Sequence, residues 1–527
     1  MRQVSPWIYR ISSRPSISAD VPVPVQILPE AFIQQLTHSL GPERAGEVLS
    51  CILDTPPSTA VRLNPFKMPD CISGTLSGLC PFLPADNERR TFSRLGLFLK
   101  ERPEFALDPL FHAGAYYVQD ASSMYLESIM PYMVRMRSER PEGTFAVLDL
   151  CAAPGGKTTH LLSMLRGIPG AFLVSNEVIR TRASVLCENV SKWGASNVVV
   201  TNNDPADFSA LQAYFDVVAV DAPCSGEGMF RKDRGAVEEW SEANVRLCAD
   251  RQKRILSDVL PALRPGGLLV YSTCTFNHFE DEDIVAWLES EYGFEVLEQR
   301  HFYPGDEGAG EGFFFSLLRM PDRCAGDRGQ QSDVAPAGLR GSRYGNGRRA
   351  GGSEIYRPFE AVDWIRDGFR VFRKGNIIKA FPDGACAEMQ MFEACSGLRI
   401  MMSGCAVAEV KGVSAGGADM VRGGGGKSVR ADLKGKGLIV PLYSLIQSEV
   451  LRRGILPEAE VSLDKALDYL RRDPVVLPDA PSGYVILTYR PDVPEDCAIP
   501  ALPIGLVKNL GNRCNSLLPP SIALRKR

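Results

Sequence analysis

Apolar and polar positions along residues 107–320 predict strands and helices in alternation. Short, almost wholly apolar runs are typical of buried strands, and stretches with an apolar residue at every third or fourth position are typical of amphipathic helices. The predicted strands are residues 146–150, 171–176, 197–201, 215–220 and 267–272, and the predicted helices are 158–165, 181–193, 245–263 and 280–291. This alternation predicts an α/β fold with a doubly wound, mainly parallel sheet covered by helices on both faces.

The rest of the chain has different patterns of residues and a different composition. Residues 25–105 read as a separate mixed α/β module, with amphipathic helices at 31–40 and 45–53 and a strand at 60–64. A segment rich in Gly, Arg, Ser and Asp predicts a flexible linker, and the Gly-rich residues 412–427 predict a disordered loop or insertion. We therefore expect an N-terminal extension, an N-terminal module, a sheet domain, a linker and a smaller α/β or β-rich C-terminal region at residues 1–24, 25–105, 106–320, 321–353 and 354–527.

Composition narrows the class of protein without pointing to a partner. The 527 residues are 45% hydrophobic and 23% charged, with a formal net charge of −4, so any nucleic-acid contact must come from local basic patches. The 14 cysteines include no C-x-x-C pair, which argues against zinc, and we expect no metal. Their scatter suggests reduced thiols, and no apolar run would span a bilayer or act as a secretory signal. We expect a cytoplasmic protein with no membrane partner.

A glycine-containing turn is the first candidate ligand site. It follows the predicted strand at 146–150, in the run Val147-Leu-Asp-Leu-Cys-Ala-Ala-Pro-Gly-Gly-Lys-Thr-Thr159. Two glycines let the backbone approach a ligand closely, and ligands of open α/β sheets bind beyond the carboxyl ends of the strands. Neither the phosphate-loop spacing nor G-x-G-x-x-G is present. Glu177 and Asp204 end the next two strands, where carboxylates could accept from ribose hydroxyls and an adenine amino group, so an adenosine-containing ligand is favoured over a purely structural turn.

Two cysteines follow the two later strands. Asp221, Pro223 and Cys224 come directly after the strand at 215–220, and Cys274 comes directly after the strand at 267–272. A thiolate that adds to carbon 6 of cytosine makes carbon 5 nucleophilic, which is covalent catalysis. Asp221 is placed to hydrogen-bond the ring, the second thiol can assist release, and Lys157 is the nearest cation that could lower the pKa of a thiol, unless it forms only a structural salt bridge.

These residues resemble the Nol/Nop/Sun family of RNA cytosine-C5 methyltransferases, which have a Rossmann-like class I methyltransferase fold. The matching segments are LDPLFHAGAYYVQDASSM, LDLCAAPGGKTTHL, VSNEV, NND, VDAPCSGEGMF and STCTFNHFEDE, in the family's order. The resemblance implies that Cys274 is the nucleophile and Cys224 the release cysteine. It implies an S-adenosyl-L-methionine site formed by Cys151, Ala152, Ala153, Pro154, Gly155, Gly156, Lys157, Glu177, Asp204 and Asp221.

The two flanking regions resemble parts of the RsmF-like bacterial branch of this family, which modifies 16S rRNA. The C-terminal run IGLVKNLGNRCNSLLPPSIALRK is similar to the end of a PUA-like RNA-binding module, and the N-terminal module is expected to bind RNA as well. The expected partner is therefore 16S rRNA or the small ribosomal subunit. RNA contact needs positive charge, for which we single out Arg340, Arg343, Arg348, Arg349, Lys508, Arg513, Arg525, Lys526 and Arg527.

Three alternatives remain open from the sequence. A DNA cytosine methyltransferase would use Cys224 of the Pro-Cys pair as the nucleophile, and Cys187-Glu-Asn-Val190 imitates another motif of those enzymes, although it lies inside a predicted helix and before the Pro-Cys pair. The substrate could be tRNA. The chain could also be a ribosome-assembly protein that binds RNA without turnover, although such a protein has no need of the two cysteines.

Overall fold

The computed structural model describes residues 27–68, 85–322, 356–359, 362–411, 438–492 and 499–524. The predicted N-terminal extension, nearly all of the predicted linker and the Gly-rich segment at 412–427 lie outside these residues. So do Arg340, Arg343, Arg348, Arg349, Arg525, Lys526 and Arg527. In the part of the chain that the structure describes, no helix is long and apolar enough to cross a membrane.

A helical hairpin and a small antiparallel sheet make up the N-terminal part. Helices α1 (Glu30–Leu40) and α2 (Pro42–Asp54) meet at Gly41, whose φ of +78° favours glycine. The sheet has the order β2-β3-β1-β4, formed by β2 (Ala85–Arg90), β3 (Gly96–Leu99), β1 (Thr59–Leu63) and β4 (Tyr116–Val118). Strand β4 comes from beyond residue 105, so this sheet reaches past the sequence boundary that we predicted for the module.

Short helical segments connect this sheet to the central one. They are η3 (Phe105–Leu107), α3 (Pro109–His112), η4 (Ser122–Ile129) and α4 (Met130–Glu139). Asp108 caps α3 by accepting a hydrogen bond from the Leu110 amide, and Pro109 stands at the first helical position, where its missing N–H has no intrahelical partner to lose.

An eight-stranded sheet forms the centre of the molecule, in the order β10-β11-β9-β8-β5-β6-β7-β15. Strands β9, β8, β5, β6 and β7 run parallel, and the order reverses between β5 and β8. This reversal is the switch point of an open α/β sheet, where ligands bind beyond the carboxyl ends. The parallel strands are β5 (Phe145–Asp149), β6 (Ala171–Asn176), β7 (Val198–Thr201), β8 (Phe215–Asp221) and β9 (Leu263–Thr273).

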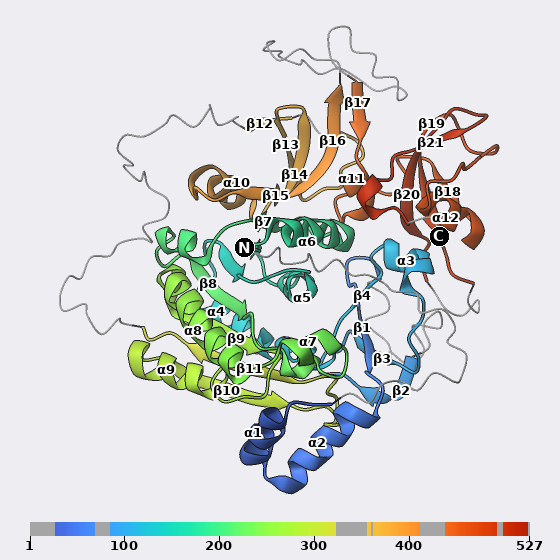
Figure 1. Cartoon of the computed structure of the whole chain (residues 1–527). Helices are drawn as coiled ribbons and strands as arrows, with labels where there is room; N and C mark the ends of the chain where they lie inside the picture. Colours follow the sequence, from blue (N-terminus) through green and yellow to red (C-terminus); the bar gives the residue numbers. More distant parts are fainter. Residues whose placement is uncertain are drawn as a thin grey trace, which may run out of the picture.

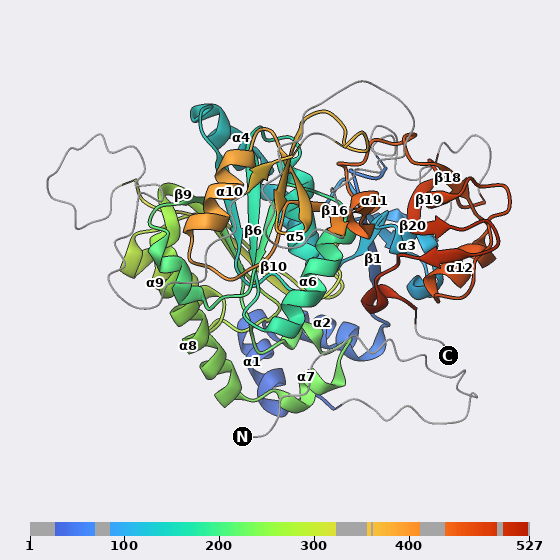
Figure 2. The same ribbon diagram turned by 90° about the horizontal axis from the view of Figure 1, so that it is seen from above.

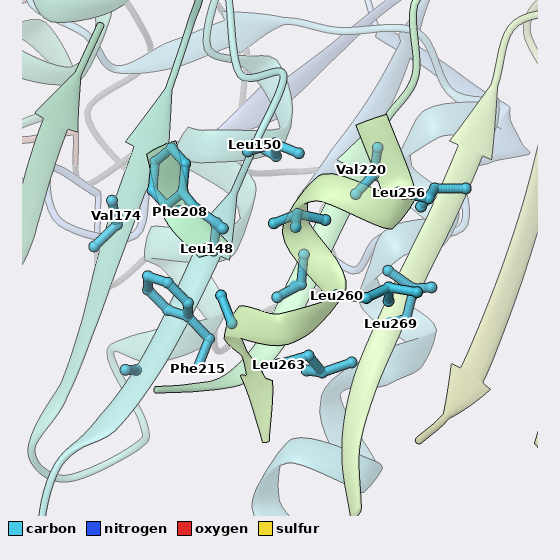
Figure 3. Close-up of a cluster of buried hydrophobic side chains, with 14 of the residues drawn as sticks. Leu148, Leu150, Val174, Phe208, Phe215, Val220, Leu256, Leu260, Leu263 and Leu269 are labelled. Atoms are coloured by element: carbon cyan, nitrogen blue, oxygen red, sulfur yellow. The ribbon is translucent and has the colours of Figure 1, made fainter. Parts of the chain in front are cut away.

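Helices cover both faces of this sheet because its strands are apolar on both sides. On β5, Ala146 and Leu148 face one buried cluster, and Phe145 and Val147 face another. Figure 3 shows the first cluster, in which Leu256 and Leu260 lie over strands β5, β8 and β9. The helical elements are α5 (Gly156–Leu165), α6 (Arg180–Trp193), η5 (Pro205–Ala210), η6 (Glu227–Met229), α7 (Arg234–Glu239), α8 (Glu242–Val259), η7 (Leu260–Ala262) and α9 (Glu282–Tyr292).

The strands at both edges of the central sheet run antiparallel to their neighbours, so the sheet is mixed and not purely parallel. Strands β10 (Glu295–Phe302) and β11 (Phe313–Arg319) form a hairpin beside β9, and β15 (Ile400–Ser403) pairs antiparallel with β7. The predicted helix at 245–263 is also divided, because Pro261 lacks a backbone N–H and β9 begins at Leu263. Strand β15 belongs to the region that we placed in the C-terminal part.

Two further sheets make up the C-terminal part. The first has the order β12-β13-β14-β16-β17 and the second the order β18-β19-β20-β21. The elements are β12 (Arg357–Pro358), β13 (Phe369–Lys374), β14 (Ile377–Pro382), α10 (Cys386–Cys395), β16 (Cys405–Lys411), β17 (Leu438–Pro441), α11 (Tyr443–Gln447), β18 (Glu458–Glu460), α12 (Leu463–Leu470), β19 (Gly483–Tyr489), β20 (Leu502–Asn509), β21 (Cys514–Ser516) and η8 (Pro520–Ile522).

The N-terminal and C-terminal parts pack against each other. Figures 1 and 2 place α3 next to the elements of the last sheet, and a shared buried cluster contains Val61 of β1, Leu110 of α3, Tyr469 of α12 and Ile504 of β20. The central sheet is therefore flanked by modules from both ends of the chain.

Candidate functional site

The glycine turn lies between β5 and α5, as the sequence predicts. Gly155 has a φ of +114°, and a Cβ atom added there would lie 3.2 Å from Leu186 Cδ1, so this position favours glycine. Neighbouring elements hold the turn: the Ala152 amide donates to the Asn176 carbonyl at 2.8 Å, and Arg182 donates to the Ala153 carbonyl at 2.8 Å. The turn is thus a rigid wall at the switch point of the sheet.

A small pocket of about 160 Å³ opens beside this turn. Seven of the predicted site residues line it: Cys151, Ala152, Ala153, Pro154, Gly156, Lys157 and Asp221. The rest of the lining comes from β4 and the segment after it, through Tyr117, Val118, Gln119, Asp120 and Ser123. We did not predict roles for these five, although they stand in the segment LDPLFHAGAYYVQDASSM that carried part of the resemblance.

Lys157 and Asp221 form an ion pair across this pocket. Lys157 Nζ lies 2.8 Å from Asp221 Oδ1, and the Ser272 hydroxyl donates to the same oxygen at 2.8 Å. Strand pairing brings Ser272 there, because Asp221 and Ser272 face each other across β8 and β9. The ammonium group of Lys157 therefore lies against a carboxylate, and the ion pair that we weighed as the simpler role of this residue is present.

The two predicted cysteines meet at the ends of β8 and β9. Cys224 Sγ and Cys274 Sγ are 3.1 Å apart, and the Cys274 amide lies 3.4 Å from Cys224 Sγ. The hydrogen bond with Cys274 raises the pKa of the Cys224 thiol well above its usual value, and burial raises it further. Either sulfur can be the donor in this contact, and donation from Cys224 to Cys274 is the arrangement expected if Cys274 is the nucleophile.

Two buried glutamates connect the loops that carry the thiols. Glu227, in the loop after Cys224, accepts hydrogen bonds from the Thr275 hydroxyl at 2.6 Å and the Phe276 amide at 2.8 Å. In the opposite direction, Glu280 accepts from the Ser225 amide at 3.0 Å and from Gln252 at 2.8 Å. Each loop is thus held by a carboxylate of the other.

A glycine completes this connection. The Gly228 amide donates to the Cys274 carbonyl at 2.9 Å, and an added Cβ at Gly228 would lie 2.4 Å from the Gly312 carbonyl oxygen. A side chain at this position would collide with the Gly312 backbone and crowd the Cys274 carbonyl oxygen at 3.0 Å, so the loop after β8 would have to shift. We predicted no role for the two glutamates or for this glycine. The sequence of a motif does not show which backbone atoms its residues will contact in the folded protein.

A second, larger pocket of about 440 Å³ lies at the ends of β6 and β7. Its lining comprises Val178, Asn202, Asn203, Asp204, Asp207, Gly397, Leu398 and Arg399. The predicted residue Asp204 lines this pocket and also caps η5 by accepting from the Ala206 amide at 3.1 Å. Glu177 is buried next to Val178, and its carboxylate accepts from the Ile179 amide at 2.9 Å.

Two models of known protein families match parts of the chain. Residues 138–319 match the family model described as 16S rRNA methyltransferase RsmB/F. Residues 28–121 match the model described as the N-terminal domain of 16S rRNA methyltransferase RsmF. Residues 28–121 and 138–319 are thus similar to RsmB/F methyltransferases. All the predicted site residues, from Cys151 to Cys274, fall within the first match.

Similar proteins carry names from the same RsmB/F family. Ribosomal RNA small subunit methyltransferase F of Klebsiella pneumoniae (strain 342) is 33% identical over 315 residues, which cover 56% of this chain and 62% of that protein. The protein of the same name from Citrobacter koseri is 40% identical over 221 residues, which cover 41% of this chain and 44% of that protein. The chain thus spans less than two thirds of the length of these relatives.

A methyltransferase homologue of known structure from Pyrococcus horikoshii is 26% identical, with a TM-score of 0.46 over 55% of this chain and 95% of that one.

Among the described residues, one group of side chains has the composition of a metal site. Ligand atoms of Asp281, Glu282 and His301 lie within 4.8 Å of one another. His301 Nε2 is 2.8 Å from Glu282 Oε1, and the Thr273 hydroxyl donates to Asp281 Oδ1 at 2.6 Å. Asp281 Oδ2 and His301 Nδ1 are buried without a hydrogen-bond partner among the described residues. The expectation of no metal stays a prediction.

Proposed function

We propose that the chain is an S-adenosyl-L-methionine-dependent RNA cytosine-C5 methyltransferase that forms 5-methylcytosine in 16S rRNA. The observation that carries this proposal is the pair of thiols, 3.1 Å apart, at adjacent strand ends beside the glycine turn. A cytosine C5 methyltransferase needs a thiolate nucleophile and a group that assists release of the product. The matches to the family models and the names of the relatives support the reaction and the rRNA substrate.

The residues around the two pockets fit the cofactor. The turn from Cys151 to Lys157, together with Asp221, would hold the methionine part, and Glu177 and Asp204 would hold the adenosine part. Acidic side chains suit a cofactor with positively charged sulfonium and amino groups, and Val178, with a side chain that is 55% exposed, offers apolar surface to a base. The cofactor supplies an electrophilic methyl group.

Cys274 acts as the nucleophile in this proposal. Its thiolate would bond to carbon 6 of the cytosine, and the ring electrons would move toward carbon 5. Carbon 5 would then take the methyl group, and the electrons of the broken sulfur–methyl bond would stay on the sulfur of the donor. Asp221 is ion-paired with Lys157, so its carboxylate can accept a hydrogen bond from the exocyclic amine of the base. The target base must leave any stack to reach this position.

Release requires that the proton on carbon 5 passes to a base while the bond between Sγ and carbon 6 breaks. The ring then regains its double bond and Cys274 leaves as a thiolate. Cys224 remains protonated because its pKa is raised by the hydrogen bond with Cys274 and by burial. Its S–H can stabilise the departing thiolate, which supports the role of release cysteine.

We further propose that the N-terminal module and the last sheet, β18–β21, bind RNA. The C-terminal sequence resembles a PUA-like module, and Lys508 and Arg513 lie on or next to β20 and β21 of this sheet. Ribosomal RNA as the substrate would place the protein in the cytoplasm. The target would be either free 16S rRNA or the small ribosomal subunit, and both are included in the test.

The test uses the full chain, labelled cofactor and RNA in which cytosine is replaced by 5-fluorocytosine, so that the adduct persists. Cys274→Ser should abolish both methyl transfer and the covalent adduct, whereas Cys224→Ser should let an adduct accumulate on unmodified RNA. Cys187→Ser serves as the matched control, because Cys187 lies on α6 away from both loops, and it should behave like the wild type.

The substrate arms compare 16S rRNA, assembled small subunits, tRNA and DNA. An adduct that disappears only with Cys224→Ser would support the DNA-type arrangement, and transfer to tRNA alone would change the substrate. If no RNA or DNA accepts a methyl group, the non-catalytic ribosome-assembly alternative is favoured and the proposed function fails.

A further inference from the structure

The larger pocket has walls from two distant parts of the sequence. Val178 and residues 202–207 follow the strands β6 and β7 of the methyltransferase sheet, whereas Gly397, Leu398 and Arg399 belong to the turn that leads into β15. This turn lies outside both family matches, and the sequence motifs assign no role to it.

Hydrogen bonds fix the turn to the loop after β7. The Asn202 amide donates to the Arg399 carbonyl at 3.0 Å, and the Arg399 amide donates to Asn203 Oδ1 at 2.9 Å. The register continues into the sheet, where Ile400 faces Thr201 and Met402 faces Val200. The position of the turn is therefore set by the backbone of β7 as well as by side chains.

One side chain links the two walls. The Asn202 amide nitrogen Nδ2 donates to the carbonyls of Glu177 and Val178 at 2.8 and 2.9 Å, and its Oδ1 accepts from the Arg399 guanidinium at 3.2 Å. A ligand that touches Val178 on one wall is thereby connected to Arg399 on the other through a single residue.

The chemistry of the lining selects a planar base with an exocyclic amine. Val178 and Leu398 offer apolar surface, which suits the face of a heteroaromatic ring. Asp204 and Asp207 supply carboxylate acceptors on the same pocket, which suit an amino group. Adenine has both features, and it is the base of the cofactor that we propose.

We propose that the turn Gly397–Arg399 forms the outer wall of the adenine end of the cofactor pocket, with Leu398 as a positioning residue for the base. This inference rests on the proposed function, because it takes S-adenosyl-L-methionine as the cofactor. It implies that the C-terminal region contributes directly to cofactor binding and that residues 106–320 alone would bind the cofactor more weakly.

The first test measures binding of S-adenosylhomocysteine and of methylthioadenosine to the full chain by titration calorimetry. Leu398→Ala should weaken both ligands by about fivefold, because both contain adenine and both lose apolar contact. Leu398→Asp should weaken them more, since a charged group would replace the apolar contact with the face of the base. Leu438→Ala is the matched control: Leu438 is an exposed leucine on β17, and its replacement should leave binding unchanged.

A kinetic measurement separates this role from a general structural one. The KM for the methyl donor should rise in Leu398→Ala while kcat at saturating donor stays at the wild-type value, because the thiols lie at other strand ends. Hydrogen exchange provides a readout without turnover: S-adenosylhomocysteine should slow exchange of the Asn202 and Arg399 amides, which bond across the two walls.

Unchanged affinity in both Leu398 variants, or unchanged exchange at residues 397–399, would overturn this inference while the wild type still binds the ligand. If the wild type itself does not bind S-adenosylhomocysteine, the proposed function fails instead, so the two failures are distinguishable.

Discussion

At the scale of single residues, the carboxyl group of Asp149 is buried near the glycine turn with only one of its oxygens hydrogen-bonded to a residue that the structure describes. Asp149 is buried at the end of β5, where Oδ2 accepts from the Thr158 hydroxyl at 2.6 Å and Oδ1 is buried without a hydrogen-bond partner among the described residues. Burial raises its pKa from 3.8 to about 7. The neutral acid is therefore the form that the fold favours.

This shift predicts a pH dependence of stability. The folded pKa is above the unfolded one, so the contribution of the protonated group is fully present below about pH 3.8 and is lost as pH rises through about 7. Asp149→Asn removes the titration. Its stability relative to the wild type should increase from pH 4 to pH 7 and then level off, by up to about 4 kcal/mol.

Chemical unfolding of Asp149→Asn and of the wild type at each pH measures this difference. Asp149 lies near Lys157, Glu177 and Asp221, which also influence its pKa, so the comparison is made without ligand. A difference between the two proteins that is the same at pH 4 and pH 8 would contradict the prediction.

At the scale of elements, the reciprocal bonds of Glu227 and Glu280 hold the loop after β8 against the loop after β9. Glu227 also accepts from Trp240 Nε1 at 2.9 Å, and Phe230 and Phe276 pack with Phe32 of α1. The helical hairpin at the start of the chain thus supports the loop that carries Cys274. The distance between the thiols depends on these contacts and not on the strands alone.

Replacement of either glutamate should disturb the relative position of the two thiols and lower activity. Glu227→Gln turns an amide N–H₂ toward groups that themselves donate, so the Cys274 loop should shift, and kcat should fall about tenfold, or about 1.4 kcal/mol. Glu280→Gln should act in the same direction through the Cys224 loop. The KM values for RNA and cofactor should change little, because neither glutamate lines a pocket.

Glu449→Gln is the control for this pair, since Glu449 accepts from Ser196 Oγ at 2.8 Å and contacts neither thiol loop. The rate of Cys274 alkylation by iodoacetamide gives a second readout: it should change in Glu227→Gln and Glu280→Gln and stay unchanged in the control. Unaltered kcat and alkylation in both variants would show that the strands alone position the thiols.

At the scale of the whole molecule, buried polar contacts join the modules from the two ends of the chain to the central sheet domain and to each other. Arg62 of β1 donates to Gln119 at 2.7 Å and to the Thr159 hydroxyl of α5 at 2.7 Å. Lys67 donates to the carbonyl of Gln447 in α11. Burial disfavours the charged forms and lowers the pKa of Arg62 to about 9 and that of Lys67 to about 7.

The overall charge of −4 makes local basic residues decisive for RNA binding. Lys508→Gln combined with Arg513→Gln should lower affinity for rRNA and reduce the slope of log K against log salt by roughly two, because two phosphates would no longer be neutralised. Filter binding at several salt concentrations measures the slope, and Arg135→Gln, which alters an exposed arginine of α4, is the control. An unchanged slope in the double variant would remove these residues from the RNA surface.

The periodicity of the sequence was sufficient to predict the strands and helices at the centre of the fold. Strand β6 coincides with the predicted residues 171–176, and helix α6 begins one residue before the predicted 181–193. Buried parallel strands are apolar on both faces and their helices are amphipathic, so each element leaves a local pattern. The edge strands β10, β11 and β15 were not predicted, because pairing at an edge depends on a partner far away in the sequence.

The motifs showed which residues would gather at one edge of the sheet, because the strands of a parallel sheet have their carboxyl ends on the same side. This reasoning places Cys151, Lys157, Asp221, Cys224 and Cys274 at the switch point, while their roles stay predictions. Only the tertiary structure decided that Glu227 and Glu280 cross between the thiol loops and that Gly397–Arg399 reaches the second pocket. Those contacts join segments that are distant along the chain, and the physical reason is that hydrogen bonds of this kind leave no periodic trace in the sequence.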